Sequence, residues 1–306
     1  MSDRATPKLS VITPSYNQGR LIERTIRSVL DQSYPNLEYV IVDGGSTDET
    51  VEVIRRYEDQ LAWWVSEPDE GQSHAINKGI ERTSGEIVAY INSDDFYLPG
   101  AFETAVAAFE RSDAGWVAGA SLDLLEGNPP IELGAWQPEP PSETEGPLPG
   151  RHWWLLAPWH LPQPSVFWRR GLLQGYGPFR QDMSNVFDAE LMVRLAIAGE
   201  MPVLLPNDVL ATRLSHPGQK SRGFGRSRAE IRRFAELFGQ QLTESERRRL
   251  AVLRWPVWGW RVVREVAVDP VLRLGGRVLE HLPARLRPRI RGRDRRPSLA
   301  ELRRYR

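Results

Sequence analysis

Two adjacent carboxylates, Asp94 and Asp95, closely follow the apolar run of residues 87–91. Such a run predicts a buried strand, and open α/β sheets bind their ligands at the edge where parallel strands end. Neighbouring aspartates repel each other unless a cation or the hydroxyls of a ligand neutralise them. Mg²⁺ and Mn²⁺ prefer oxygen ligands and often share them with substrate phosphates. The pair therefore predicts a metal or ligand site, with a solvated turn that caps a helix as the alternative.

The elements that must position this pair form a repeating pattern in the N-terminal third. Short apolar runs alternate with helical periodicity, which predicts a parallel sheet with right-handed crossovers. Each run ends in a cluster of Gly, Ser, Asn or Asp, so the loops that follow should gather at one edge of the sheet, where we expect the site. The expected strands are residues 9–13, 39–42, 63–65 and 87–91, and the expected helices are 21–30, 51–57 and 75–80.

Four short motifs occur in order along this pattern. They are Thr-Pro-Ser-Tyr-Asn at 13–17, Val-Asp-Gly-Gly-Ser-Thr-Asp at 42–48, Asn-Lys-Gly at 77–79 and Ser-Asp-Asp at 93–95. Together they resemble the family 2 glycosyltransferases, over about residues 8–216. The resemblance implies a GT-A fold, an α/β (Rossmann-like) mixed, mainly parallel sheet flanked by helices. It also implies a nucleotide-diphosphate sugar donor, a Mn²⁺ or Mg²⁺ cofactor and inversion at the anomeric centre.

The resemblance also implies roles for the carboxylates and for one histidine. Asp95 would ligate the metal, and Asp94 would contact the ribose or sugar hydroxyls of the donor. His216, in Leu-Ser-His-Pro-Gly, would be a metal ligand or a phosphate contact, and its alternative is a surface-turn histidine before a proline. Asp188 opens a helix over 188–199 that looks like the acidic helix carrying the catalytic base, with a simple N-cap as its alternative. Glu190 points to another side of that helix and is assigned to donor binding.

The remaining donor-binding residues lie in the first three loops. Pro14, Tyr16 and Asn17 would surround the nucleobase, with Tyr16 stacked on it, and Asp43 would lie near the base or ribose. The chain departs from one common family version, Asp-Asp-Gly-Ser, by having Gly44 at the second acidic position, which leaves the nucleobase open. The third loop and its helix contribute Asp69, Gly71 and Lys78, where Lys78 is equally well explained as a solvated lysine.

The chain divides into a catalytic part and a basic end. We expect a GT-A domain over 1–244, with a nucleotide-binding half at 8–120 and an acceptor and catalytic half at 151–216. Residues 127–150, rich in Pro, Glu and Gly, predict a surface loop between these halves. Residues 245–306 carry 18 Arg against 6 Asp and Glu, and form a basic helical C-terminal extension, while the whole chain has a formal net charge of zero. Trp153 and Trp154 would stack on acceptor sugars or belong to the core.

Composition favours a cytoplasmic enzyme. The chain has no cysteine, which excludes a disulfide framework and thiolate chemistry. Its first residues lack the apolar core of a signal peptide, and no apolar run approaches the roughly 20 residues that span a bilayer.

The basic extension predicts a second kind of partner. Trp255, Trp258 and Trp260 stand beside Arg261 and Arg264, a mixture that suits the surface of an anionic membrane. Packing on the domain and contact between copies are the alternatives. We expect no nucleic-acid partner, because no nucleic-acid module accompanies the charge. Peripheral membrane attachment would suit a lipid-linked acceptor in cell-surface polysaccharide assembly.

Three functional classes follow from these features. An inverting glycosyltransferase acting on a glycan or lipid-linked acceptor is the first. A nucleotidyltransferase of similar fold is the second, but it would need a Gly-rich loop with Arg or Lys after the first strand, and residues 13–19 contain neither basic residue. A non-catalytic nucleotide-sugar-binding protein is the third, and the presence of all three aspartates, at 94, 95 and 188, argues against it.

Overall fold

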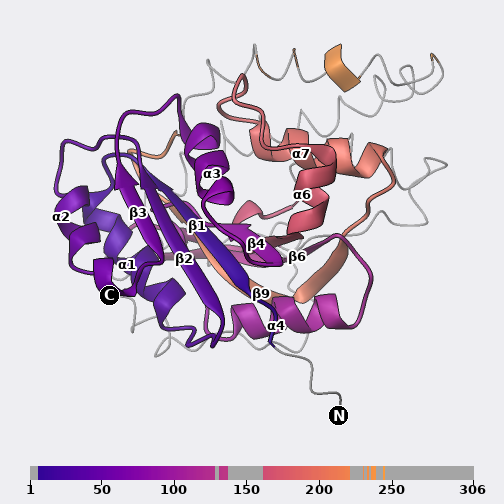
Figure 1. Cartoon of the computed structure of the whole chain (residues 1–306), viewed down its shortest axis with the longest axis horizontal. Coiled ribbons are helices and arrows are strands. Elements are labelled where there is room, and N and C mark those ends of the chain that lie inside the picture. The colour runs from indigo at the N-terminus through magenta and orange to yellow at the C-terminus, as the bar shows by residue number, and fades with distance from the viewer. Residues whose placement is uncertain are drawn as a thin grey trace, which may run out of the picture.

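The computed structural model describes residues 6–127, 131–136 and 161–220, and beyond them positions 230, 233, 236–238 and 244. A mixed β-sheet runs through its centre, with helices on both faces (Figure 1). The strand order is β3-β2-β1-β4-β8-β6-β9-β5, and β7 pairs with β6. The strands are β1 Leu9–Ser15, β2 Leu37–Asp43, β3 Trp63–Ser66, β4 Ile87–Tyr90, β5 Phe96–Tyr97, β6 Trp116–Leu125, β7 Ile131–Trp136, β8 Val166–Arg169 and β9 Val203–Ser215. The predicted fold class is confirmed.

The first four strands are parallel neighbours, as predicted from their alternation with helices. The helices α1 (Gly19–Leu30), α2 (Thr50–Arg55) and α3 (Gln72–Glu81) connect them. Because all four strands run the same way, the loops that follow them share one edge of the sheet. The motif residues of the first three loops and the aspartate pair therefore belong to the same edge.

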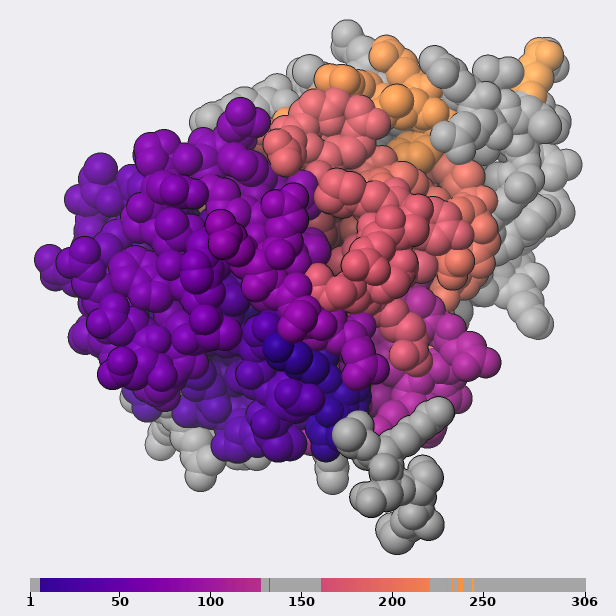
Figure 2. Space-filling model, viewed as in Figure 1, coloured from indigo at the N-terminus to yellow at the C-terminus, as the bar shows by residue number. Residues whose placement is uncertain are grey.

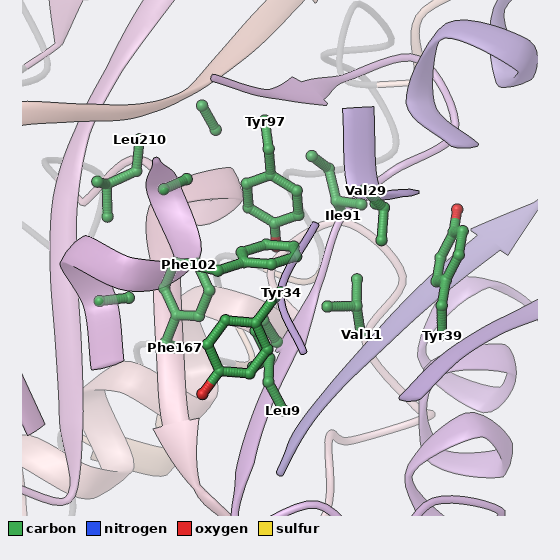
Figure 3. Close-up of a cluster of buried hydrophobic side chains, with 14 of the residues drawn as sticks. Leu9, Val11, Val29, Tyr34, Tyr39, Ile91, Tyr97, Phe102, Phe167 and Leu210 are labelled. Atoms are coloured by element: carbon green, nitrogen blue, oxygen red, sulfur yellow. The ribbon is translucent and has the colours of Figure 1, made fainter. Parts of the chain in front are cut away.

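The side chains of these strands alternate between two hydrophobic clusters, one on each face of the sheet. In β1, Leu9 and Val11 point to one face and Ile12 points to the other, as the period of two in a strand requires. The first face is covered by α1, α2 and α4 (Ala101–Glu110), and its core contains Tyr97, Phe102 and Phe167 (Figure 3). The opposite face is covered by α3, α6 (Arg170–Tyr176) and α7 (Phe187–Ile197).

The second half of the sheet is antiparallel where it meets the first. Strand β8 lies antiparallel to β4 and joins it to β6, and β9 lies antiparallel to the short strand β5. In that pairing Phe96 lies opposite Thr212 and Tyr97 opposite Ala211. Continued toward the loop, this register brings the end of β9 to the residues that precede β5. His216 thus returns to the aspartate pair from 122 residues further along the chain.

Several sequence predictions fall on residues outside the described ranges. They include the basic extension at 245–306, the tryptophans Trp153 and Trp154, and most of the expected surface loop at 127–150. Residues 131–136 of that expected loop form strand β7, which pairs antiparallel with β6, so this part of the loop prediction is wrong. Within the described ranges, no helix has the length and apolar character needed to cross a membrane.

Candidate active site

Asp94 and Asp95 have different environments although they are adjacent. Asp95 is only 2% exposed, and its carboxylate accepts hydrogen bonds from the backbone N–H of Leu214 (3.0 Å) and from Nδ2 of Asn92 (3.3 Å). Burial, with the Asp94 charge beside it, raises the pKa of Asp95 well above its usual range. The side chain of Asp94 is 13% exposed, and its Oδ2 lies 2.9 Å from Nε2 of His216. Asp94, and not Asp95, therefore pairs with the histidine.

His216 and Asp94 carry atoms of the types that ligate divalent cations. Mn²⁺ binds both imidazole nitrogen and carboxylate oxygen, whereas Mg²⁺ prefers carboxylate oxygen. Both ions commonly keep waters and substrate phosphates as further ligands. Within the described residues, no three His, Cys, Asp or Glu side chains form a group that could hold a metal. The Asp94–His216 pair supplies two ligand types that fit a divalent ion.

Asn92 connects this pair to the rest of the site, a role that the sequence analysis did not predict. Its Oδ1 accepts from Nε2 of Gln72 at 2.5 Å, and its Nδ2 also lies 3.4 Å from Oε1 of Gln163. Gln163 in turn donates to the carbonyl oxygen of Tyr90, the last residue of β4. Helix α3 and the segment before β8 are therefore tied to the loop that carries the aspartates.

Arg24 of α1 lies behind the aspartate pair. Its guanidinium stands 4.3 Å from the ring centroid of Phe96, a cation–π contact, and a buried Nη2 has no hydrogen-bond partner among the described residues. Burial lowers the pKa of Arg24, while the charges of Asp95 and Asp94 oppose that shift. This arginine places a positive charge next to two carboxylates and offsets part of their repulsion.

The first two loops are joined by a network of short hydrogen bonds. Asn17, whose φ of 51° lies in the left-handed region, accepts from the backbone N–H of Thr47 at 2.9 Å. Its own N–H donates to Oγ of Ser46 at 2.7 Å. Tyr16, next to it, is 61% exposed. The network holds the loop backbone while leaving an aromatic ring open to solvent, where a flat ligand can stack.

Asp43 differs from its predicted role near the base or ribose of a donor. It is fully buried, and its two oxygens accept from the N–H groups of Gly45 and Ser46 and from the hydroxyls of Ser46 and Ser66. Oδ2 accepts three of these bonds and Oδ1 accepts the one from the Ser46 hydroxyl. Asp43 thus organises the second loop from within.

Two further residues predicted to bind the donor have other partners. Glu190 is 2% exposed and forms an ion pair with Arg194 (2.8 Å), one turn further along α7, so it faces away from solvent. That arginine also donates to the carbonyl oxygens of Tyr176, Gly177 and Pro178. Lys78 pairs with Glu67 at 2.7 Å. The structure therefore places Glu190 in an ion pair within α7 and Lys78 in an ion pair with Glu67.

The Asn-Lys-Gly motif of α3 has a structural explanation. Asn77 exchanges two hydrogen bonds with the backbone of Phe179, at 2.8 and 3.0 Å. A Cβ at Gly79 would meet Ile12 at 2.5 Å, so only glycine allows α3 to lie this close to β1. The motif joins α3 to β1 and to the segment before α7.

The third loop places the carboxylate of Asp69 next to Gly44 of the second loop, which has no side chain. Oδ1 of Asp69 accepts from the N–H of Gly71 at 2.8 Å, and Gly71 has a φ of 114°, in the left-handed region. A Cβ at Gly44 would stand 2.8 Å from Oδ2 of Asp69. An acidic residue at position 44 would therefore collide with Asp69, and the departure of this chain from Asp-Asp-Gly-Ser leaves room for that carboxylate.

Asp188 lies in the first turn of α7, with Oδ1 accepting from the backbone N–H of Ala189 at 2.8 Å. Burial raises the pKa of Asp188, and the ammonium of Lys220 opposes the shift. Its neighbour Phe187 packs with Tyr90, Trp168 and Phe179 in an aromatic cluster. The cluster fixes the start of α7 against the end of β4, and so against the loop that bears the aspartate pair.

Lys220 is a charged residue of this region that the sequence analysis did not identify. Its ammonium donates to the carbonyl oxygen of Ser184 (2.6 Å) and to Oε1 of Gln72 (3.3 Å). Burial lowers the pKa of Lys220, and the charges of Glu230, Asp188 and Asp69 act against that shift. Its position four residues after His216 is the one sequence feature that points to Lys220. A single lysine near a histidine is too common to predict a site residue.

Comparisons with known proteins agree with this geometry. The family model described as Glycosyl transferase family 2 matches residues 10–147. A glycosyltransferase of Mycobacterium tuberculosis is 30% identical over 200 residues, which are 64% of this chain and 71% of that protein. The putative teichuronic acid biosynthesis glycosyltransferase TuaG of Bacillus subtilis is 41% identical over 127 residues, 40% of this chain, and the match spans half of that relative's length.

Among solved structures, the mannosyltransferase PcManGT from Pyrobaculum calidifontis, in complex with GDP-Man and Mn²⁺, superposes with a TM-score of 0.59. The superposition covers 81% of this chain and 69% of that one at 21% identity, so it supports the fold alone. The family match, the Mycobacterium relative and this fold agree with one another: the chain belongs to glycosyl transferase family 2.

Proposed function

We propose that this protein transfers a sugar from a nucleoside-diphosphate sugar to an acceptor hydroxyl, with inversion at the anomeric carbon and with Mn²⁺ or Mg²⁺ as cofactor. The observation that carries the proposal is the Asp94–His216 pair at the end of β4, with the partly buried Asp188 held against the same strand end. A single displacement needs a place for the leaving diphosphate and a base for the attacking hydroxyl.

Each of these residues has a role in that displacement. Asp188 takes the proton of the acceptor hydroxyl as its oxygen bonds to the anomeric carbon and the bond from that carbon to the diphosphate breaks. A raised pKa makes a carboxylate a stronger base once ionised. Asp94 and His216 would hold the cation, which when bound neutralises the leaving diphosphate. We propose Asp94 for the ligand role that the sequence analysis gave to Asp95, because Asp94 lies beside His216 and is more exposed than the buried Asp95.

The first three loops are proposed to bind the nucleoside. Tyr16 would stack on the base, and the backbone near Pro14 and Asn17 would line its edge. Asp69 has one oxygen bonded to Gly71 and the other beside Gly44. A carboxylate oxygen there accepts hydrogen bonds only, so it favours a base that presents a ring N–H, such as uracil or guanine.

The acceptor is proposed to be a glycan or a lipid-linked sugar used in cell-surface polysaccharide assembly. Two observations support this: the relative named for teichuronic acid biosynthesis and the Trp- and Arg-rich composition of residues 245–306. Arginines near an anionic surface contribute about 1 kcal/mol each. We propose cytoplasmic, peripheral attachment. Vesicles containing anionic lipid should bind the full chain at low salt and release it at high salt, and no binding to them would exclude the attachment.

A donor panel tests the proposed reaction. Uridine, guanosine, thymidine, cytidine and adenosine diphosphate sugars are incubated with the full chain, with Mn²⁺, with Mg²⁺ or with a chelator, and nucleoside diphosphate release is measured. We expect metal-dependent release from at least one donor. Pyrophosphate-dependent cleavage of a sugar nucleotide, with the pyrophosphate label appearing in the nucleoside triphosphate and with sugar 1-phosphate released, would instead identify a nucleotidyltransferase. Donor binding without release, even with acceptor glycans present, would identify a non-catalytic binding protein.

A further inference from the structure

The segment before α7, residues 180–186, is held by side chains from the far end of the described chain. Lys220 donates to the carbonyl oxygen of Ser184 at 2.6 Å. Glu230 accepts from both the backbone N–H of Asn185 (2.7 Å) and its side-chain amide (3.1 Å). Three residues further on, Arg233 pairs with Asp182 at 2.6 Å. The segment that leads into the proposed base is therefore tied down at three points by later residues.

The part of the chain that supplies these side chains is docked on the domain. Phe238 is buried in the same hydrophobic cluster as Phe187 and Leu191 of α7, and Leu237 packs against that cluster. In the space-filling view the described tail residues, in orange, lie against the segment 161–220, in salmon (Figure 2). Glu230 thus stands eight residues before a side chain that is buried in the core of the domain.

We propose that Glu230 is a positioning residue for Asp188. Asn185 stands just before Val186, the N-cap residue of α7, and three residues before Asp188. A carboxylate that accepts from both the backbone N–H and the side chain of one residue fixes its backbone and its side chain together. The start of α7 then has one defined position relative to the Asp94–His216 pair. The inference rests on the role of Asp188 proposed above.

Of the three ties, Glu230 is the one whose removal gives a clear result. Arg233 is half exposed and pairs with an exposed aspartate, an interaction that contributes little to stability. Lys220 faces Asp188 and Asp69, so its loss would change the charge of the site as well as its geometry. Glu230 hydrogen-bonds to Asn185 through both of its oxygens, and its charge also acts on Lys220. Glu230→Gln removes that charge but keeps an oxygen for Asn185, so it separates the two effects.

The experiment compares Glu230→Ala, Glu230→Gln and Glu236→Ala in the full chain. Glu236 is an exposed residue six positions further along the chain, and serves as the matched control. Transfer kinetics, donor affinity from equilibrium binding, and hydrogen exchange of the peptide covering residues 180–188 are measured for each. We expect Glu230→Ala to lower kcat by about 10-fold, within the range that a displacement of about 1 Å produces. Donor affinity should stay unchanged and the peptide should exchange faster.

Glu230→Gln keeps an oxygen for the N–H of Asn185 and should recover most of the rate, whereas Glu236→Ala should behave as the parent protein. Unchanged kcat together with unchanged exchange in Glu230→Ala would overturn the proposal. A fall in donor affinity equal to the fall in kcat would also overturn it, because it would place Glu230 in donor binding. Hydrogen exchange is measured without substrate. If the protein transferred no sugar from any donor, the proposed function would be refuted, but the exchange data would still test the contact between Glu230 and Asn185.

Discussion

Two regions of this protein are stabilised in different ways: the loops that follow β1, β2 and β3, here called the donor edge, and residues 180–186 before α7, here called the base segment. At the donor edge, motif residues bond to one another: Asn17 to Thr47 and Ser46, and Asp43 to Ser46. In the base segment, the partners are Lys220, Glu230 and Arg233, which belong to no motif. One half of a site can therefore be held by residues of short sequence motifs, while the geometry of the other half depends on residues far away in the sequence.

The largest effect is expected from Asp188→Asn, which keeps an oxygen for the N–H of Ala189 but removes the base. Sugar transfer should fall by about 10²-fold or more, the usual scale for general-base removal. Donor binding and thermal stability should change little, which separates catalysis from helix capping. Transfer at the parent rate in a folded Asp188→Asn protein would leave Asp188 as a cap only and remove the base from this segment.

The second test compares Asp94→Asn with Asp95→Asn, two identical changes at adjacent positions. Loss of the Asp94 charge should weaken Mn²⁺ binding by at least about 10-fold, because ligand changes exceed the effect of outer-shell changes. Asp95→Asn still accepts from Leu214 and should retain Mn²⁺ binding. Paramagnetic resonance of free Mn²⁺ measures both variants. The opposite ranking would return the ligand role to Asp95.

A third test addresses the nucleobase end of the donor edge. Asp69→Asn replaces one acceptor oxygen by a donor, so the affinity for UDP or GDP should fall by about 10-fold, the scale of one hydrogen bond to a charged group. Affinity for CDP should fall less. Glu67→Gln is the matched control, because Glu67 is in the same loop but pairs with Lys78. Equal losses for all nucleotides would mean that Asp69 supports the loop and does not read the base.

The smallest effect on activity should come from Glu38→Gln. Glu38 lies near the start of β2, at the end of the parallel strands away from the donor loops. Burial opposes ionisation of Glu38, but hydrogen bonds from Lys8, Ser10 and Ser84 outweigh it and lower its pKa to about 2. Because the folded pKa lies below the unfolded value, the carboxylate stabilises the fold above about pH 4.5, and this contribution is lost as the pH falls toward 2.

Glu38→Gln should therefore reduce the free energy of unfolding by about 1–2 kcal/mol at neutral pH, with kcat unchanged. The difference between parent and variant should shrink as the pH falls below about 4.5, which denaturant unfolding at several pH values would measure. A constant difference across that range would show that the charge of Glu38 contributes nothing. A fall in kcat at neutral pH would mean that the two edges of the sheet are coupled.

Much of the fold could be predicted from the sequence because its signals are local. The first four strands and their helices follow from apolar runs and helical periodicity, and the loop edge follows from the Gly, Ser, Asn and Asp clusters at the strand ends. The observed bounds of β1, β2 and β3 contain the predicted runs, and β4 ends one residue before its run. Mixed pairing with β8 and β9 was implied by the family resemblance alone, since antiparallel partners from residues 166 and 203 onward leave no local signature.

The sequence by itself determined which chemical groups the site contains: the carboxylates at 94, 95 and 188, the histidine at 216 and the open loops. Tertiary structure decided which of them are available. Burial and the N–H of Leu214 separate Asp95 from Asp94, four internal donors occupy Asp43, and Arg194 occupies Glu190. Residue type fixes what a side chain can donate or accept, whereas its exposure and its partners come from contacts between segments that lie far apart in the chain.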